Sequence, residues 1–235
     1  MKYCCFVISA LLILVATGKT DKCQVVDVDS STSCGNLLSY PYSSWNAAGG
    51  EINGSPIICG GSPKSDSGKS CYRFDQFENT WKFHAYMKSI RHSHAAAVIK
   101  DVLFISGGVS NGQLASTEFI HANGTVTSGT NLPLARQGHC MVTLHDGKVM
   151  ILGAESPHSL TKNVILFDPA DSYTTEPSMS YPRNNAACTL FKSDLHDGRP
   201  VVLSAGGLSQ ATAQVYDYTN SNHWQTSIHL IISNM

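Results

Sequence analysis

The sequence predicts an all-β protein built from repeated, four-stranded antiparallel sheets. Apolar runs that end in a glycine doublet or a near variant occur four times, and they end at Gly61, Gly108, Ala154 and Gly207, in steps of 47, 46 and 53 residues. No stretch shows sustained helical periodicity. Only 14% of the residues are charged, so the Glu/Lys/Leu bias of helical bundles is missing.

The first strand of a unit is predicted to follow an arginine. Three such runs begin at Arg91 (RHSHAAAVIKD), Arg136 (RQGHCMVTLHDG) and Arg183 (RNNAACTLFKSDLHDG). Each ends in KD or HDG, which suits a tight hairpin whose central residues have positive φ. The third run is longer, which accounts for the 53-residue step, because insertions in repeats collect in loops.

The second strand of a unit is predicted to end at the doublet. A glycine there lets two backbones approach closely and adopts a φ that other residues avoid. The signature glycines are Gly60, Gly61, Gly107, Gly108, Gly153, Gly206 and Gly207.

The third and fourth strands are predicted from an aromatic-Asp pair with a tryptophan six or seven residues later. The pairs Phe74-Asp75 and Tyr216-Asp217 precede Trp81 and Trp224. Asx-type turn residues between the two runs indicate a hairpin, and the aromatic rings are expected to fill the space between sheets.

A single four-stranded sheet cannot bury both faces, so such units stack radially as the blades of a β-propeller. The doublet glycine, aromatic-Asp pair and tryptophan at this period resemble the kelch repeat over roughly residues 45–227. The second copy departs from it with Ile120-His121 and no tryptophan, and the third with Ala154 and Thr174.

The resemblance implies more blades than the four counted, so we expect a partial kelch-type β-propeller of about four four-stranded blades. A truncated gene product, a splice variant or a partial sequence would explain this. The alternatives are a complete four-bladed ring and an open arc that associates with itself through its exposed edge.

Four regions are predicted: a signal peptide at 1–18, a cysteine-containing segment at 19–44, the blades at 45–227 and a non-repeat tail at 228–235. Residues 1–18 hold one lysine, an apolar run and small residues at Ala16 and Gly18, a pattern typical of secretion and too short for a membrane anchor. Segment 19–44 is read as a disulfide-pinned cap, or alternatively as a strand (Val25, Val26 and Val28) that completes a blade.

Six cysteines remain after removal of the signal peptide, and an even number in an oxidising compartment favours disulfides. Spacing makes Cys23–Cys34 and Cys59–Cys71 the short-range candidates, which leaves Cys140 and Cys188. No spacing typical of a zinc site occurs, so no structural metal is expected.

Histidines alternate along the second unit's first strand. His92, His94 and His139 raise the question of a metal site, but a His after the Arg is common in kelch first strands, so the resemblance implies a structural role. The three repeat arginines could form a ring that grips carboxylates or phosphates, or could tie down neighbouring carbonyls, which is the preferred interpretation.

No catalytic constellation is identifiable. The sequence holds no GxSxG elbow, HExxH helix or P-loop, and the tyrosine, cysteine and histidine set of galactose-oxidase-like copper enzymes cannot be mapped onto it. No cofactor is predicted. A fragment of such an oxidoreductase stays the alternative, beside a nonfunctional truncation.

Two sequons fit the N-glycosylation pattern, Asn123-Gly124-Thr125 and Asn53-Gly54-Ser55, the second disfavoured by Pro56.

After removal of the signal peptide, the chain has no stripe of basic residues that could bind nucleic acid or anionic lipid. By analogy with the fold, we expect a secreted binding module whose rim loops recognise an extracellular protein or glycan.

Overall fold

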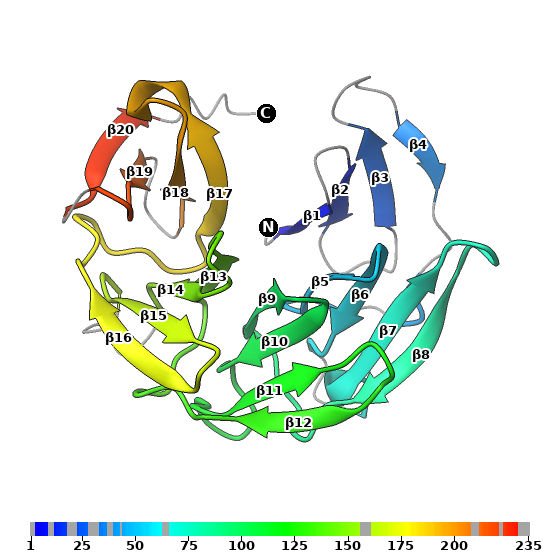
Figure 1. Ribbon diagram of the computed structural model, residues 1–235. Helices are drawn as coiled ribbons and strands as arrows, with labels where there is room; N and C mark the ends of the chain where they lie inside the picture. The colour runs from blue at the N-terminus through cyan, green and yellow to red at the C-terminus, as the bar shows by residue number, and fades with distance from the viewer. Residues whose placement is uncertain are drawn as a thin grey trace. The chain divides into compact units, whose positions relative to one another are not determined.

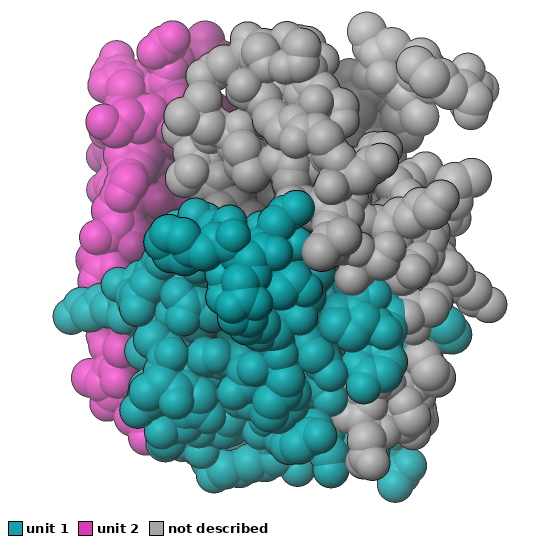
Figure 2. Space-filling view, turned by 90° about the vertical axis from the view of Figure 1, so that its right-hand side faces the viewer, with its two compact units in different colours: residues 1–131 teal, residues 132–235 magenta. Residues whose placement is uncertain are grey.

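The computed structural model describes residues 3–8, 12–17, 23–27, 33–36, 40–42, 44–62, 66–155, 161–207, 212–220 and 223–229. Side chains are described from residue 40 onward, without those of 66, 67 and 227–229. Two compact units divide the chain, residues 1–131 (unit 1) and 132–235 (unit 2), which Figure 2 shows in teal and magenta.

Five antiparallel sheets of four strands each make up the described chain, and in every sheet the strands follow one another in chain order (Figure 1). Unit 1 contains three of them. Its strands are β1 (Tyr3–Ile8), β2 (Leu12–Thr17), β3 (Cys23–Asp27), β4 (Ser33–Asn36), β5 (Ala48–Ile52), β6 (Ser55–Cys59), β7 (Ser70–Asp75), β8 (Thr80–Tyr86), β9 (Ala95–Ile99), β10 (Val102–Ser106), β11 (Thr117–Ile120) and β12 (Val126–Gly129).

Unit 2 contains the other two sheets. Its strands are β13 (Cys140–Thr143), β14 (Val149–Leu152), β15 (Val164–Asp168), β16 (Ser172–Glu176), β17 (Ala187–Ser193), β18 (Arg199–Ala205), β19 (Thr212–Tyr216) and β20 (Gln225–His229). Short 3-10 turns at Asp66–Lys69 and Asp194–His196 are the helical elements among the described residues. None of them has the length or the apolar character of a membrane span.

The four predicted repeats coincide with the four sheets after residue 45. Each doublet directly follows a second strand, namely β6, β10, β14 or β18. The hairpin between β9 and β10 turns through Lys100 (φ 47°) and Asp101 (φ 61°), as the KD pattern predicts. The last strand reaches His229, two residues beyond the predicted boundary of the repeats.

The sheet of β1–β4 was not predicted. It includes residues of the expected signal peptide, whose β-branched, apolar run suits a buried strand as well as a secretion signal. Cleavage after residue 18 would remove β1 and β2 from this sheet. The signal peptide and the disulfide-pinned cap therefore stay predictions.

Gly60 and Gly153, the first glycines of their doublets, lie where one sheet meets the next. Gly60 has φ 66°, and a Cβ on it would lie 2.6 Å from the Arg91 carbonyl oxygen. The next residue, Gly61, donates its N–H to that same oxygen at 2.9 Å. In unit 2 Ala154 donates to the Arg183 carbonyl at 3.2 Å, so the alanine variant keeps the link between sheets.

Each unit has an apolar core between neighbouring sheets. In unit 1 it joins the β5–β8 and β9–β12 sheets, through residues that include Ile57, Leu103 and Ile105. In unit 2 Trp224 lies in the core, stacks on Tyr216 with ring centroids 5.1 Å apart and donates its indole N–H to the Pro177 carbonyl. Tyr216 and Trp224 thus fill space between the two sheets of unit 2, as expected for the aromatic residues of the repeat.

The aspartates of the aromatic-Asp pairs shape the turns that follow. Asp75 accepts the backbone N–H groups of Phe77 and Glu78, and Asp217 accepts that of Thr219. This is the geometry of an Asx turn, and it explains why the repeat places an aspartate at the end of its third strand.

Candidate interaction surface

Aromatic side chains gather on one face of the β7–β8 hairpin. Tyr72 pairs across the strands with Phe83, and Phe74 pairs with Trp81. Ring centroids lie 5.9 Å apart in the first pair and 5.4 Å apart in the second, and Tyr86 continues the row 4.6 Å from Phe83. Alternate strand residues point to the same face, which places Tyr72 with Phe74 and Trp81 with Phe83. A register shift between Cys71 and Tyr72 brings Tyr86, three residues after Phe83, into the same row.

The segment before β5 adds two tyrosines to this row. Tyr40 is buried, with its ring centroid 5.6 Å from Tyr72 and 5.3 Å from Trp81. Tyr42 lies 5.7 Å from Tyr72, and the two hydroxyl oxygens are 3.4 Å apart. Burial, with help from this hydrogen bond, raises the pKa of Tyr72 to about 12, so its phenol is neutral at physiological pH.

The outer part of the row is open to solvent. Tyr42 is 44% exposed, Phe83 49% and Tyr86 54%, while Phe77 at the tip of the β7–β8 turn is fully exposed. We call Tyr42, Tyr72, Phe77, Phe83 and Tyr86 the aromatic surface. Clustered exposed rings mark interaction sites, whereas scattered ones need no explanation.

A hollow of about 440 Å³ adjoins this surface and is lined by the turns at 53–55 and 75–77 together with Arg73, Lys82 and His84. Lys82 lies 2.7 Å from Asp75, whose carboxyl pKa that hydrogen bond lowers, and Arg73 donates to the Ile52 carbonyl oxygen at 2.9 Å. The hollow offers polar groups beside exposed rings, a combination suited to recognition.

The three repeat arginines are buried, with at most 2% of each exposed. Arg91 and Arg183 donate to the carbonyl oxygens of Gly107 and Gly206, the first glycines of their own doublets. Each arginine also donates to a side-chain oxygen at one equivalent position, at or directly before the start of the third strand, contributed by Ser116, Asn163 or Thr212.

These contacts correspond to the preferred interpretation, in which the arginines tie down carbonyls of the sheet. A ring that grips a ligand from solvent would need exposed guanidinium groups, and these three lie in the interior. In the first repeat Ser44 takes the arginine's place and donates its hydroxyl to the Gly60 carbonyl at 3.2 Å. Burial lowers the pKa of Arg136 to about 10, so it stays cationic at neutral pH.

Two of the three histidines that raised the question of a metal site, His94 and His139, lie in the interior. His94 and His139 are 6% exposed, and burial lowers the pKa of His94 to about 3. Where side chains are described, no three His, Cys, Asp or Glu residues come together as a metal site. A histidine packed against glycines fits a structural role, since a Cβ on Gly60 or Gly108 would strike His94.

Two disulfides join the predicted partners. Cys59 and Cys71 are directly opposite in β6 and β7, and Cys140 on β13 is bonded to Cys188 on β17. The second disulfide links two sheets of unit 2. The expected Cys23–Cys34 pair concerns side chains outside the described residues.

The aromatic surface was missed from the sequence alone. The alternation of Tyr72 with Phe74, and of Trp81 with Phe83, was the available signal. It reads as the core of a sheet, because burial or exposure of each ring depends on what packs over the hairpin.

No protein-family model matches the chain. Alpha-scruin of Limulus polyphemus is 27% identical over 157 residues, 63% of this chain and 16% of its own length. Spermatocyte protein spe-26 of Caenorhabditis elegans is 23% identical over 75% of this chain and 33% of its own. Kelch-like protein terF of Aspergillus terreus is 31% identical over 44% of this chain and 26% of its own.

The chain therefore spans a third or less of each of these relatives. Among solved structures, that of YjhT superposes with a TM-score of 0.79 at 13% identity, over 97% of this chain and 84% of that one. The glycine doublets, the aromatic-Asp pairs, the strand order and these similarities together identify the chain as a kelch-repeat protein with the β-propeller fold.

Proposed function

We propose that the protein is a secreted interaction module that binds an extracellular protein through its aromatic surface. Kelch-repeat proteins generally mediate protein interaction. The observation that carries the proposal is the set of exposed rings on the β7–β8 hairpin, above all Phe77, which is fully exposed at the turn.

Aromatic side chains suit this role because each buries a large area when a partner covers it. Interfaces are enriched in Tyr, Phe and Trp, and a few such residues supply most of the binding energy. Tyr72 and Phe83 are held as a cross-strand pair on the sheet, so these two rings lose little side-chain entropy on binding. The neighbouring Lys69 ammonium, 5.2 Å from the Tyr86 centroid, adds a positive charge to the edge.

Secretion is supported by the N-terminal pattern and by the cysteines. Residues 1–18 have the charged start, apolar run and small residues of a signal peptide. Disulfides such as Cys59–Cys71 and Cys140–Cys188 persist in oxidising compartments.

The test exposes the purified chain to a library of recombinant extracellular domains and to a glycan array. The variant Phe77→Ser/Phe83→Ser is compared with Leu195→Ser, a matched control because Leu195 is 90% exposed in unit 2. We expect a protein ligand whose affinity falls at least about 100-fold in the double variant and stays unchanged in the control.

Equal binding by the double variant would disprove the role of the aromatic surface. Binding confined to the glycan array would replace the protein partner by a carbohydrate.

A further inference from the structure

We propose that Asn123 carries an N-linked glycan and that Asn53, the other sequon, stays unmodified. The inference rests on the proposed secretion, because the modification takes place in the secretory pathway. It goes beyond that function by assigning a modification site to one turn of the second repeat.

Asn123 lies in the turn between β11 and β12, two neighbouring strands of one sheet (Figure 1). Asn123 and Thr125 are both exposed. The turn is closed by hydrogen bonds between the backbones of His121 and Thr125 and of Gly124 and His121, each 2.9 Å long. Gly124 supplies the positive φ of 84° that this turn requires.

The Asn123 side chain is already oriented within its sequon. Its Oδ1 accepts the backbone N–H of Thr125 at 3.0 Å, so the amide oxygen faces the third sequon residue. The sugar bonds to the other amide atom, Nδ2. The structure thus brings the Asn and Thr of the sequon together on an exposed turn.

The chemical step needs one co-reactant, a lipid-pyrophosphate-linked oligosaccharide. Nδ2 of Asn123 attacks the anomeric carbon, a C–N bond forms, and the bond between that carbon and the pyrophosphate oxygen breaks. The lipid pyrophosphate leaves with the bonding electron pair, and the amide nitrogen loses one proton. No electron donor or acceptor is involved.

Asn53 is also exposed, but the rest of its sequon is held differently. Ser55 is the first residue of β6 and pairs with Ile52 across a two-residue turn. Pro56 follows directly and fixes the backbone after the sequon, before folding as well as after it. The Asn53 backbone N–H also donates to Asp101 of the next sheet.

A glycan at Asn123 would start beside the hollow described above. His84 lines that hollow, and its Nε2 lies 2.9 Å from the His121 carbonyl oxygen at the base of the turn. The glycan would therefore limit access to the hollow from the β11–β12 side, while Phe77 projects from the β7–β8 turn.

The experiment expresses the full chain in secreting animal cells with two leaders, its own residues 1–18 and a heterologous cleavable signal peptide. Mobility before and after peptide-N-glycosidase treatment is combined with peptide mapping. Asn123→Asp removes the reacting nitrogen and keeps the turn's acceptor oxygen, and Thr125→Ala removes the sequon hydroxyl. Thr125→Ser and Asn53→Asp are the matched controls.

We expect the wild type, Thr125→Ser and Asn53→Asp to show the same single shift, and Asn123→Asp and Thr125→Ala to show none. A chain exported by the heterologous leader without a glycan, or with a glycan on Asn53, would overturn the inference. If only the heterologous leader gives export and a glycan on Asn123, the proposed secretion fails and the glycosylation site stands.

Discussion

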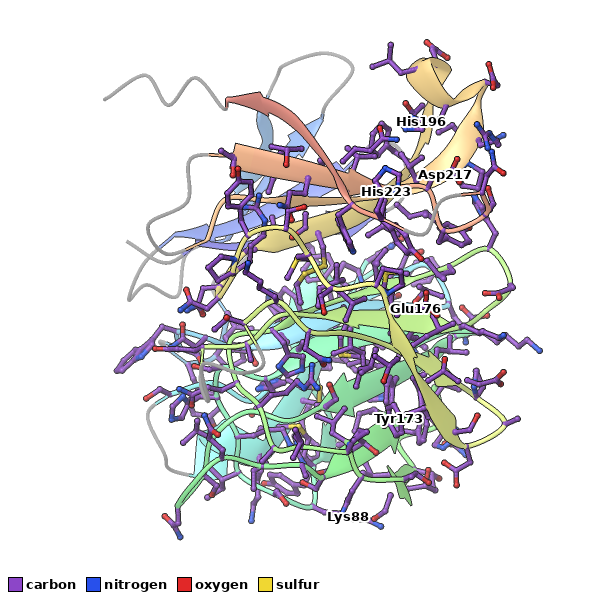
Figure 3. The ribbon with its side chains drawn as sticks, turned by 90° about the vertical axis from the view of Figure 1, so that its left-hand side faces the viewer. Lys88, Tyr173, Glu176, His196, Asp217 and His223 are labelled. Carbon is purple, nitrogen blue, oxygen red and sulfur yellow. A yellow bond between two sulfur atoms is a disulfide. The ribbon has the colours of Figure 1, made fainter. Side chains whose placement is uncertain are left out.

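Arg91 and Glu118 form an ion pair inside unit 1, where 0% of the arginine side chain and 2% of the glutamate side chain are exposed. The guanidinium also donates to Gly107 and Ser116. The carboxylate accepts the backbone N–H groups of Lys88, labelled in Figure 3, and Ser89. The pair thus connects the end of β8 with β11 and the doublet, and almost every polar atom in it has a partner.

Removing one member of this pair is expected to destabilise the protein strongly. Glu118→Leu would leave a buried guanidinium without its counter-ion, which costs about 3–5 kcal/mol in the free energy of unfolding. Urea denaturation of the intact chain measures it. The double variant Arg91→Met/Glu118→Leu should lose less than Glu118→Leu alone, because no unpaired charge remains. Equal losses would show that packing, not charge, governs the site.

Gly60→Ala is expected to weaken the junction between the β5–β8 and β9–β12 sheets of unit 1. The new Cβ would meet the Arg91 carbonyl, and φ is 66°. Gly54→Ala is a matched control, because Gly54 has φ 70° and no atom within 4 Å of an added Cβ. We expect the first variant to lose about 1–3 kcal/mol more than the second in thermal or urea unfolding. A similar loss in both would attribute the whole effect to backbone strain.

His94 should make the protein less stable in acid. Burial lowers the pKa of His94 in the folded protein to about 3 from the ordinary 6.5. Between these two pH values His94 is protonated in the unfolded chain and neutral in the folded one. The free energy of unfolding then falls as the pH drops, approaching about 1.4 kcal/mol per pH unit between 6 and 3. Urea titrations of the wild type and His94→Asn at several pH values measure this slope. The same slope in both proteins would exclude His94 as its source.

The Cys140–Cys188 disulfide should contribute more to stability than Cys59–Cys71. The two bonds close loops with sequence separations of 48 and 12 residues. Chain-entropy arguments give about 4 kcal/mol for the longer loop and about 3 kcal/mol for the shorter. Paired Cys→Ala variants, compared by denaturation under non-reducing conditions, test the order. A larger loss from the Cys59/Cys71 pair would mean that core packing outweighs loop closure.

The repeat architecture could be predicted because its signals are local. The KD turn, the doublet and the aromatic-Asp pair each require a specific backbone conformation within a few residues. The spacing of the doublets then fixes the four sheets after residue 45. The role of Gly60 beside the Arg91 carbonyl followed from the same reasoning, since only a residue without a Cβ fits there.

What could not be predicted depends on contacts distant in sequence. The arginine motif gives no sign that Ser44 replaces it in the first repeat, because a serine hydroxyl reaches the Gly60 carbonyl only in the folded sheet. Exposure of Phe83 beside the buried Trp81 is likewise decided by what packs over the hairpin. The sheet of β1–β4 could not be predicted either, because the apolar run at residues 12–17 suits a strand as well as a secretion signal.

The bond between Cys140 and Cys188 also has a mechanical consequence. Pulled from its ends, the chain would transmit force through this covalent crosslink, so the enclosed segment, with a separation of 48 residues, could not extend. The unfolded chain would therefore extend by about 160 Å less under force until the disulfide is reduced. Under tension, the two sheets of unit 2 would thus behave differently before and after exposure to a reductant.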